Sequence, residues 1–239
     1  MNLVIDLGNT NAKWAIFDNQ NMLTCNILNS FSLNNVLEIV ANYPLVKNLA
    51  ISNNRKPIKQ LQDFCDNKKI KLISITHLSK LPITINYESP DTLGVDRISL
   101  AIGASFKYPG NTLIIDLGTC ITYDLLLEGQ YIGGQISPGI SMRLSSLHTF
   151  TANLPNLKFK YIEEDIGKNT TNSMLIGVLD SILFEIENVI EKYKTRYPNI
   201  GVVLTGGDLN IVKNKIKHIN FVSPYLLMEG LNYIIAFNE

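Results

Sequence analysis

Cysteine and histidine are scarce in this chain of 239 residues, which contains three of each. Cys25, Cys65 and Cys120 are odd in number and lie too far apart to follow the spacing of a disulfide framework or a zinc site. The histidines are equally scattered, so the close His and Cys pairs of a structural zinc centre are missing. We therefore expect reduced cysteines in a cytoplasmic protein.

An excess of charge of either sign is also missing, because 21 Lys and Arg residues balance 21 Asp and Glu residues. Binding to a duplex needs a basic surface that neutralises phosphates, so we expect no nucleic-acid partner. No apolar run approaches the roughly 20 residues that span a bilayer. The short apolar N-terminus is interrupted by Asp6 and is followed by no cleavage site, which indicates a strand and not a signal peptide. We expect a soluble chain without a membrane partner.

The sequence does contain a duplicated motif. Residues 3–10 (LVIDLGNT) and 113–119 (LIIDLGT) both end an aliphatic run in Asp, followed by an apolar residue, Gly and a small polar side chain. Such runs predict buried strands, and Gly8 and Gly118 allow a tight turn and close approach of a ligand. Burying Asp is costly unless a cation or donor meets it. Two copies predict a duplicated domain with an acidic, Gly-lined cleft between the halves.

The residue pattern around each copy predicts the same order of elements. The expected strands are 2–7, 13–17, 22–28, 49–52 and 72–75, then 113–116, 121–127, 131–137 and 202–207. The expected helices are 32–40 (with Ser32 as N-cap), 58–64 and 92–108, then 139–152, 171–197 and 224–237. Residues 109–111 (PGN) break the chain, so we predict domains at 1–109 and 110–239. This order predicts an α/β protein with mixed sheets covered by helices.

The finer motifs resemble those of the type III pantothenate kinases, a bacterial branch of the actin-like (ribonuclease H-like) ATPase superfamily. The matching segments, in the family's order from end to end, are 6–10, Tyr87 with Pro90, 94–97, 116–119, 133–139, 151–155, 167–170 and 206–207. Val95 departs from the usual alanine, and residues 120–121 replace Ala-Thr. The resemblance implies two actin-like domains, each a mixed five-stranded sheet with helices, and a nucleotide cleft between them.

The resemblance also implies an activity: ATP-dependent phosphorylation of pantothenate to 4′-phosphopantothenate, the first step of coenzyme A biosynthesis. Two alternatives remain open. A non-catalytic, transcription-linked accessory factor of the same fold would be expected to lose the cleft carboxylates. Another small-molecule kinase of the superfamily would be expected to lack the 94–97 motif with Tyr87. The sequence contains no P-loop and no G-x-G-x-x-G motif.

The first motif provides the expected nucleotide site. Its turn offers backbone N–H groups and small side chains to phosphate oxygens, and Asp6 is placed to hold Mg²⁺. The alternative is an ordinary hairpin whose Asp caps a turn. The resemblance implies contacts with ATP by the following residues: Asp6, Leu7, Gly8, Asn9, Thr10, Asn11, Ala12, Lys13 and Thr119. It also implies that Asp116 binds a monovalent cation, K⁺ or NH₄⁺.

The acceptor site is expected around residues 94–97. A carboxylate within hydrogen-bond reach of the attacking hydroxyl can accept its proton, and the resemblance assigns this role to Asp96. It implies contacts with pantothenate by Tyr87, Gly94, Val95, Asp96, Arg97 and Thr170. From the residues alone, Asp96 and Arg97 also suit a surface pair in a first helical turn. By the same reasoning, Tyr87 suits a core position and Thr170 a helix cap.

Two further features leave alternatives open. The glycines at 133–134 and 138–139 suit either a bend lining the cleft or a hairpin turn. The resemblance implies a homodimer with the substrate pocket at its interface. The apolar stripe from Ile182 to Tyr193 suits that contact or plain core packing.

Overall fold

The computed structural model describes residues 1–8, 11–28, 30–53, 59–76 and 78–239. Asn9 and Thr10 of the expected nucleotide site therefore lie outside the described residues. The chain forms two compact units. The first unit comprises Met1–Pro109, Leu127–Gly133 and Tyr225–Glu239, and the second comprises Gly110–Leu126 and Gly134–Pro224.

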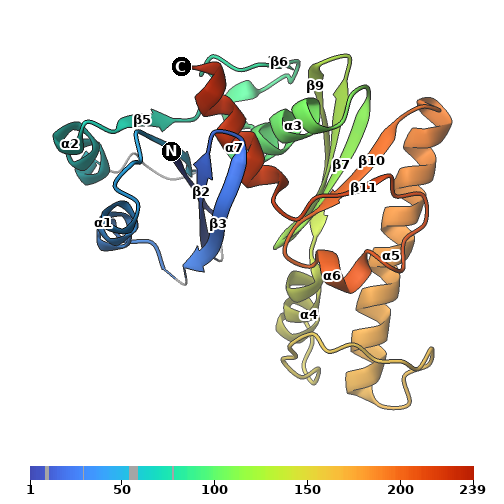
Figure 1. Cartoon of the computed structure of the whole chain (residues 1–239). Helices are drawn as coiled ribbons and strands as arrows, with labels where there is room; N and C mark the ends of the chain where they lie inside the picture. The colour runs from blue at the N-terminus through green and yellow to red at the C-terminus, as the bar shows by residue number, and fades with distance from the viewer. Residues whose placement is uncertain (9–10, 29, 54–58, 77) are drawn as a thin grey trace. The chain divides into compact units, whose positions relative to one another are not determined.

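The first unit is built on a five-stranded mixed sheet (Figure 1). Its strands are β1 (Asn2–Leu7), β2 (Ala12–Asp18), β3 (Asn21–Leu28), β4 (Asn48–Asn53) and β5 (Lys71–Ser74), in the order β3-β2-β1-β4-β5. The strands β1 to β3 form an antiparallel meander, whereas β4 and β5 continue parallel to β1. The helices α1 (Leu33–Asn42) and α2 (Lys59–Lys68) follow β3 and β4. Ser32 is the N-cap of α1, as predicted, because its hydroxyl accepts from the Asn35 amide at 3.3 Å.

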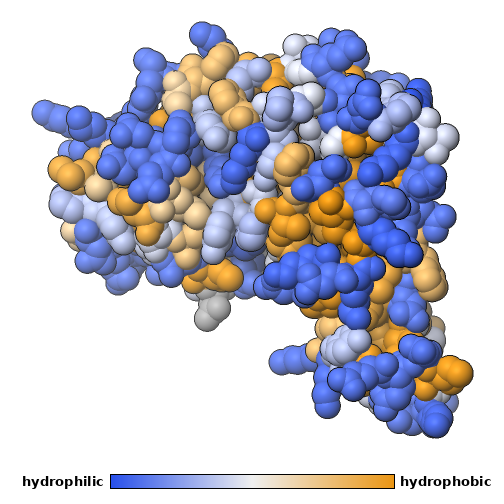
Figure 2. Space-filling view, turned by 45° about the vertical axis from the view of Figure 1, so that its right-hand side comes forward, coloured by the Kyte–Doolittle hydropathy of each residue, from blue (hydrophilic) through white to orange (hydrophobic). Residues whose placement is uncertain are grey.

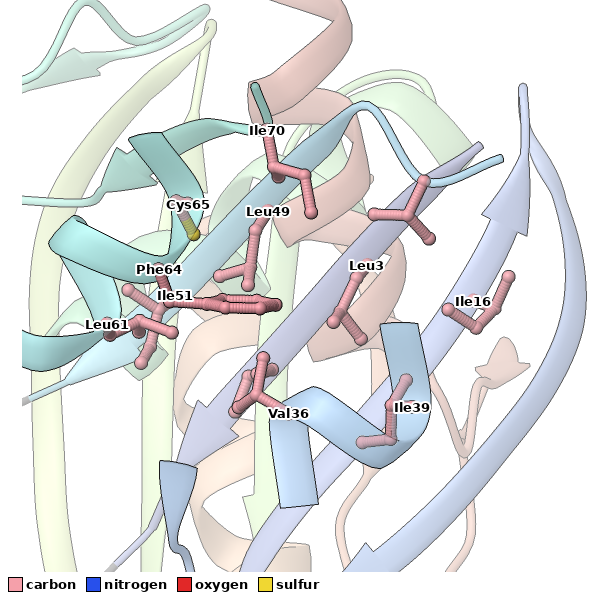
Figure 3. Close-up of a cluster of buried hydrophobic side chains, with 12 residues drawn as sticks. Leu3, Ile16, Val36, Ile39, Leu49, Ile51, Leu61, Phe64, Cys65 and Ile70 are labelled. Carbon is pink, nitrogen blue, oxygen red and sulfur yellow. The ribbon is translucent and has the colours of Figure 1, made fainter. Parts of the chain in front are cut away.

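The core of this unit fixes the position of β1. Leu3 and Ile5 are fully buried and belong to a cluster with apolar side chains of α1 and α2. Figure 3 shows Leu3 in this cluster. Alternate residues of a strand point to opposite faces, and β1 is buried from Asn2 to Asp6. The strand is therefore buried on both faces, between β2 and β4.

The remaining helices of the first unit, α3 (Val95–Lys107) and α7 (Leu226–Phe237), pack at very short range. A Cβ added to Gly230 would lie 1.9 Å from the Ser99 carbonyl oxygen, and one added to Gly103 would lie 2.5 Å from that of Leu226. The rings of Phe106 and Tyr233 stack at 4.4 Å. These glycines bring α7 against α3, so residues 225–239 group with the first unit and not with the rest of 110–239 as we expected.

The expected helix 92–108 begins at Val95 because Pro90–Thr92 form a separate 3-10 turn, η1. A short strand, β6 (Thr84–Ile85), pairs in parallel with Gln130 and Tyr131 of β9 within the same unit. The segment 82–90 therefore contains a strand that the sequence pattern did not predict.

The second unit repeats the first (Figure 1). The second sheet has six strands, one more than the five that we expected, in the order β11-β10-β7-β8-β9-β6. Its strands other than β6 are β7 (Thr112–Leu117), β8 (Cys120–Leu127), β9 (Gln130–Pro138), β10 (Gly201–Thr205) and β11 (Phe221–Val222). Leu127 of β8 and Gln130–Gly133 of β9 group with the first unit, and the other residues of these strands belong to the second unit. Its helices are α4 (Ile140–Thr149), α5 (Thr170–Arg196) and α6 (Leu209–Val212). Apart from β6, the strand order of this sheet corresponds to that of the first, as a duplicated fold requires. We did not predict α6 or β11, which are only four and two residues long.

No helix within the described residues is long and apolar enough to cross a membrane.

Candidate active site

Asp6 lies at the end of β1, between two neighbouring strands. The register places it beside Lys13 of β2 and Ser52 of β4. The Asp6 residue is 9% exposed and Ser52 is 1% exposed, and the Ser52 hydroxyl donates a hydrogen bond to the Asp6 carboxylate. Ser52 belongs to no motif, so only the pairing of β1 with β4 reveals this contact.

The pKa of Asp6 is raised to about 6: burial raises it most, the Ser52 hydrogen bond lowers it, the Asp96 carboxylate raises it, and Lys13 lowers it. The structure therefore places Asp96 within electrostatic reach of Asp6 in the first unit. Two carboxylates near each other repel, and a divalent cation would relieve that repulsion. The carboxylate oxygens of Asp6 are therefore of the kind that Mg²⁺ prefers as ligands.

Asp96 lies in the first turn of α3, immediately after the N-cap Gly94 and Val95. Its Oδ1 atom accepts from the Arg97 amide at 3.0 Å. A Cβ added to Gly94 would lie 2.3 Å from that Oδ1 atom. Gly94 therefore leaves the space that the Asp96 carboxylate occupies, a role that the sequence motif did not reveal.

Arg97 is 6% exposed, although arginine is rarely buried without partners. Its guanidinium carbon lies 5.8 Å from the centroid of the buried Tyr131 ring, which is a cation–π contact. The Tyr131 ring meets the half-buried Tyr87 ring edge to face at 6.0 Å. Gly133, with φ of 124°, would place a Cβ 3.5 Å from the Tyr87 ring. Arg97 and Tyr87 thus share one cluster, in which Tyr131 was not predicted.

The second motif forms a comparable turn in the second unit. Asp116 is half-buried at the end of β7, beside Thr122 of β8 and Thr205 of β10. Gly206, with φ of 106°, would place a Cβ 2.6 Å from the Asp116 Oδ1 atom. The strand β10 therefore ends at Thr205, and its following glycine packs directly on the Asp116 carboxylate. Thr119, in the turn after β7, is exposed.

The glycines of β9 do not form a hairpin turn, which corrects one of our two interpretations. The turn between β8 and β9 lies at Glu128 and Gly129, both with positive φ. Gly134 lies within β9, where a Cβ would lie 1.9 Å from the Tyr123 carbonyl oxygen. Gly139 follows β9 and would place a Cβ 2.2 Å from the Gly118 carbonyl oxygen. Gly134 therefore allows β9 to lie close to β8, and Gly139 allows close backbone packing on the second turn.

Thr170 lies at the start of α5 in the second unit. The N-cap of α5 is Asn169, whose side chain accepts from the Asn172 amide at 2.9 Å, so the alternative interpretation of Thr170 as the cap is wrong. Thr170 lines a cavity of about 800 Å³. The same cavity is lined by Arg143, Leu147, Leu154, Met174 and Val178. Its surface is therefore partly apolar, with a few polar side chains.

The expected site residues thus separate into two groups. The first unit contains Asp6, Leu7, Gly8, Asn11, Ala12, Lys13, Tyr87, Gly94, Val95, Asp96 and Arg97, and the second contains Asp116, Thr119 and Thr170. Within the part of the chain that the structure describes, no group of three or more His, Cys, Asp or Glu side chains is placed to hold a metal. A cation at Asp6 would complete its coordination with phosphate oxygens and water.

Comparison with protein families gives a match over most of the chain. Residues 2–192 match the family model described as type III pantothenate kinase. The chain is 39% identical to the type III pantothenate kinase of Christiangramia forsetii, with 100% of this chain and 99% of that protein aligned. It is 37% identical to the enzyme of the same name from Bacteroides fragilis, again over 100% of this chain and 99% of the relative.

Solved structures share the fold at much lower sequence identity. A Campylobacter jejuni protein described as a candidate Baf family transcriptional activator aligns with a TM-score of 0.64 at 21% identity, over 99% of this chain and 98% of that one. A glucokinase from an Antarctic psychrotroph aligns with a TM-score of 0.51 at 13% identity, over 100% and 99%. These similarities concern the fold alone, and they confirm the expected α/β class with two mixed sheets.

Proposed function

The chain belongs to the type III pantothenate kinase family, and on this basis we propose how its residues transfer the γ-phosphoryl group of ATP to pantothenate. This reaction yields 4′-phosphopantothenate and is the first step of coenzyme A biosynthesis. The observation that supports our assignment of the chemistry is that Asp96 lies within electrostatic reach of Asp6, at the end of a buried strand of the same unit. Phosphoryl transfer requires positioning and charge neutralisation more than covalent catalysis.

Asp96 is the general base in this proposal. Its carboxylate would accept the proton of the primary hydroxyl of pantothenate as that oxygen attacks the γ-phosphorus. Gly94 leaves room for the carboxylate, and α3 is held firmly by its close packing on α7. The base is therefore attached to a rigid element, which favours a reproducible attack geometry.

The nucleotide is assigned to the two motif turns. Asp6 would hold Mg²⁺ directly or through water, and Asp116 would hold the monovalent cation. When bound, these ions neutralise charge on the phosphates. Leu7, Gly8 and residues 9–13 would offer backbone N–H groups to phosphate oxygens, and Thr119 would contact the phosphates from the second turn. Lys13, which opposes the raised pKa of Asp6, adds a positive charge on this side.

Pantothenate is assigned to Tyr87, residues 94–97 and Thr170. The planar guanidinium of Arg97 suits a carboxylate or polar acceptor, and its contact with the Tyr131 ring restricts its orientation.

We further propose that the enzyme is cytoplasmic and works as a homodimer. Large apolar side chains are exposed on the second unit, including Ile136 at 62%, Phe184 at 63% and Phe150 at 86%. Figure 2 shows apolar side chains exposed on the part of the molecule that contains α4 and α5. Such exposure supports an association surface.

A coupled assay of ADP release, with and without pantothenate, tests this function. We expect turnover that depends on pantothenate and on Mg²⁺, and a stimulation by K⁺ or NH₄⁺. ATP turnover that ignores pantothenate would point to another small-molecule kinase. Failure to bind or hydrolyse any nucleotide would point to a non-catalytic factor of the same fold.

A further inference from the structure

The turn that follows β7 is held in place by the residues that follow β9. The Gly139 amide donates to the Thr119 carbonyl oxygen at 3.0 Å, and within the turn the Gly118 amide donates to the Cys120 carbonyl oxygen at 3.0 Å. A Cβ on Gly139 would lie 2.2 Å and 2.7 Å from the carbonyl oxygens of Gly118 and Thr119. With such close packing, a shift of Gly139 would shift the turn as well.

Ser137, two residues before Gly139, is anchored to the carboxylate of Glu185 on α5. The Ser137 hydroxyl donates to Glu185 Oε1 at 2.5 Å, and the Tyr123 hydroxyl donates to the same oxygen at 2.7 Å. The other oxygen, Oε2, accepts from the Arg143 guanidinium in an ion pair. Both oxygens of Glu185 are therefore engaged by residues of β8, β9 and α4.

Arg143 extends the anchor to the backbone of the same segment. Its Nε atom donates to the Pro138 carbonyl oxygen at 2.8 Å, and its amide donates to the Gly139 carbonyl oxygen at 3.0 Å. The helices α4 and α5 pack together in this region (Figure 1). Charge-assisted bonds of this type are stronger than neutral ones. The Glu185 and Arg143 pair thus fixes residues 137–139 from two sides.

The charge state of Glu185 agrees with this role. Burial alone would raise its pKa, but the hydrogen bonds from Ser137, Arg143 and Tyr123 outweigh that effect and lower the pKa. The carboxylate is therefore ionised at neutral pH, where it can hold the Arg143 guanidinium.

We propose that Glu185 is a positioning residue for ATP: through Arg143 and Ser137 it holds residues 137–139, and through Gly139 it holds the Gly118–Thr119 turn against the nucleotide phosphates. This inference rests on the proposed assignment of Thr119 to the nucleotide. Glu185 itself contacts no substrate in this proposal, and it should affect ATP more than pantothenate.

Binding of a non-hydrolysable ATP analogue, measured by calorimetry with Mg²⁺, tests the inference without the acceptor. In Glu185→Gln, which keeps the side-chain shape, we expect the dissociation constant to rise about tenfold, as displaced binding groups commonly cause. The KM for pantothenate should stay within twofold of the wild-type value. Arg143→Lys keeps the charge but loses the planar fork, and it should act in the same direction. The exposed Glu191→Gln on the same helix is the matched control and should change neither constant.

A double variant distinguishes positioning from loss of stability. If Glu185 acts through Arg143, then Glu185→Gln with Arg143→Met should weaken analogue binding no more than the stronger single variant does. Analogue binding within twofold of wild type in folded Glu185→Gln, or an equal rise in both KM values, would overturn the inference. If the wild-type protein binds the analogue but its ATP turnover does not depend on pantothenate, the proposed acceptor is wrong. The calorimetry still tests the role of Glu185 in that case.

Discussion

Asp96, in the first turn of α3, lies within electrostatic reach of Asp6, at the end of β1. Burial first and the Asp96 carboxylate second raise the pKa of Asp6 to about 6, despite the opposing hydrogen bond from Ser52. The folded protein therefore holds two carboxylates within electrostatic reach of each other, where stability alone would favour fewer charges. Such an arrangement is typical of a functional site, because a bound cation or substrate recovers the cost.

We expect Asp96→Asn to lower kcat by about a hundredfold or more, since the amide cannot accept the hydroxyl proton. Binding of a non-hydrolysable ATP analogue should stay near the wild-type value, because Asp96 acts on the acceptor. Steady-state kinetics and calorimetry measure the two effects. The exposed Asp91→Asn in η1 is the control. A near-normal kcat in Asp96→Asn would remove Asp96 from the role of base.

We expect Asp6→Asn to stabilise the protein at pH 8 in metal-free buffer while abolishing most activity. The pKa of Asp6 is about 6 in the folded state and near 3.8 otherwise, so the folded state binds more protons between these values. Its stability therefore falls as the pH rises from about 4 to 6, by roughly 3 kcal/mol at most. In Asp6→Asn the side chain is a neutral amide, so the variant does not lose this stability as the pH rises.

Urea unfolding at pH 4 and pH 8, with a chelator present, measures this difference. At pH 4 the Asn variant and wild type should be nearly equally stable, because Asp6 is then largely protonated. The exposed Asp18→Asn at the end of β2 is the control. An equal effect of Asp6→Asn at both pH values would contradict the assigned charge state.

We expect Gly94→Ala to lower kcat about tenfold with little loss of stability, because a misplaced catalytic group costs rate steeply. The added methyl group would occupy the space of the Asp96 Oδ1 atom and would push the carboxylate aside. The backbone φ of Gly94 is −59°, so alanine adopts it without strain. Thermal unfolding measures the stability of the variant, and steady-state kinetics measure its kcat. Gly201→Ala, whose Cβ would make only ordinary contacts, is the control; equal kcat values for the two variants would refute the steric role.

We expect Arg97→Lys to raise the KM for pantothenate about tenfold, because lysine lacks the planar fork and stacks poorly on the Tyr131 ring. Analogue binding by the nucleotide site should be unaffected. Arg196→Lys is the matched control, since Arg196 also lies over a tyrosine ring, at 5.4 Å from the Tyr197 centroid, on the far end of α5. If both variants leave the KM for pantothenate unchanged, Arg97 does not contact the acceptor.

Much of the fold was predictable because local pattern and turn residues decide it. The strands β1 to β3, the Ser32 cap and the restart of the same strands after Pro109 all follow from alternation, burial and turn chemistry. The family was also predictable, because its motifs occur in order along the chain. The positions of β6, α6 and β11 were not, because segments this short depend on their neighbours and not on their own propensity.

The amino-acid sequence by itself determined which residues we assign to the chemistry: a carboxylate at each motif turn, Asp96 beside Arg97, and the glycines around them. Only the tertiary structure decided which of these residues meet and what supports them. The hydrogen bond from Ser52 to Asp6, the space that Gly94 leaves for Asp96, the packing of α7 on α3 and the anchoring of residues 137–139 by Glu185 all join segments distant in the chain. Contacts of this kind arise from strand pairing and close packing, which no local pattern of residues records.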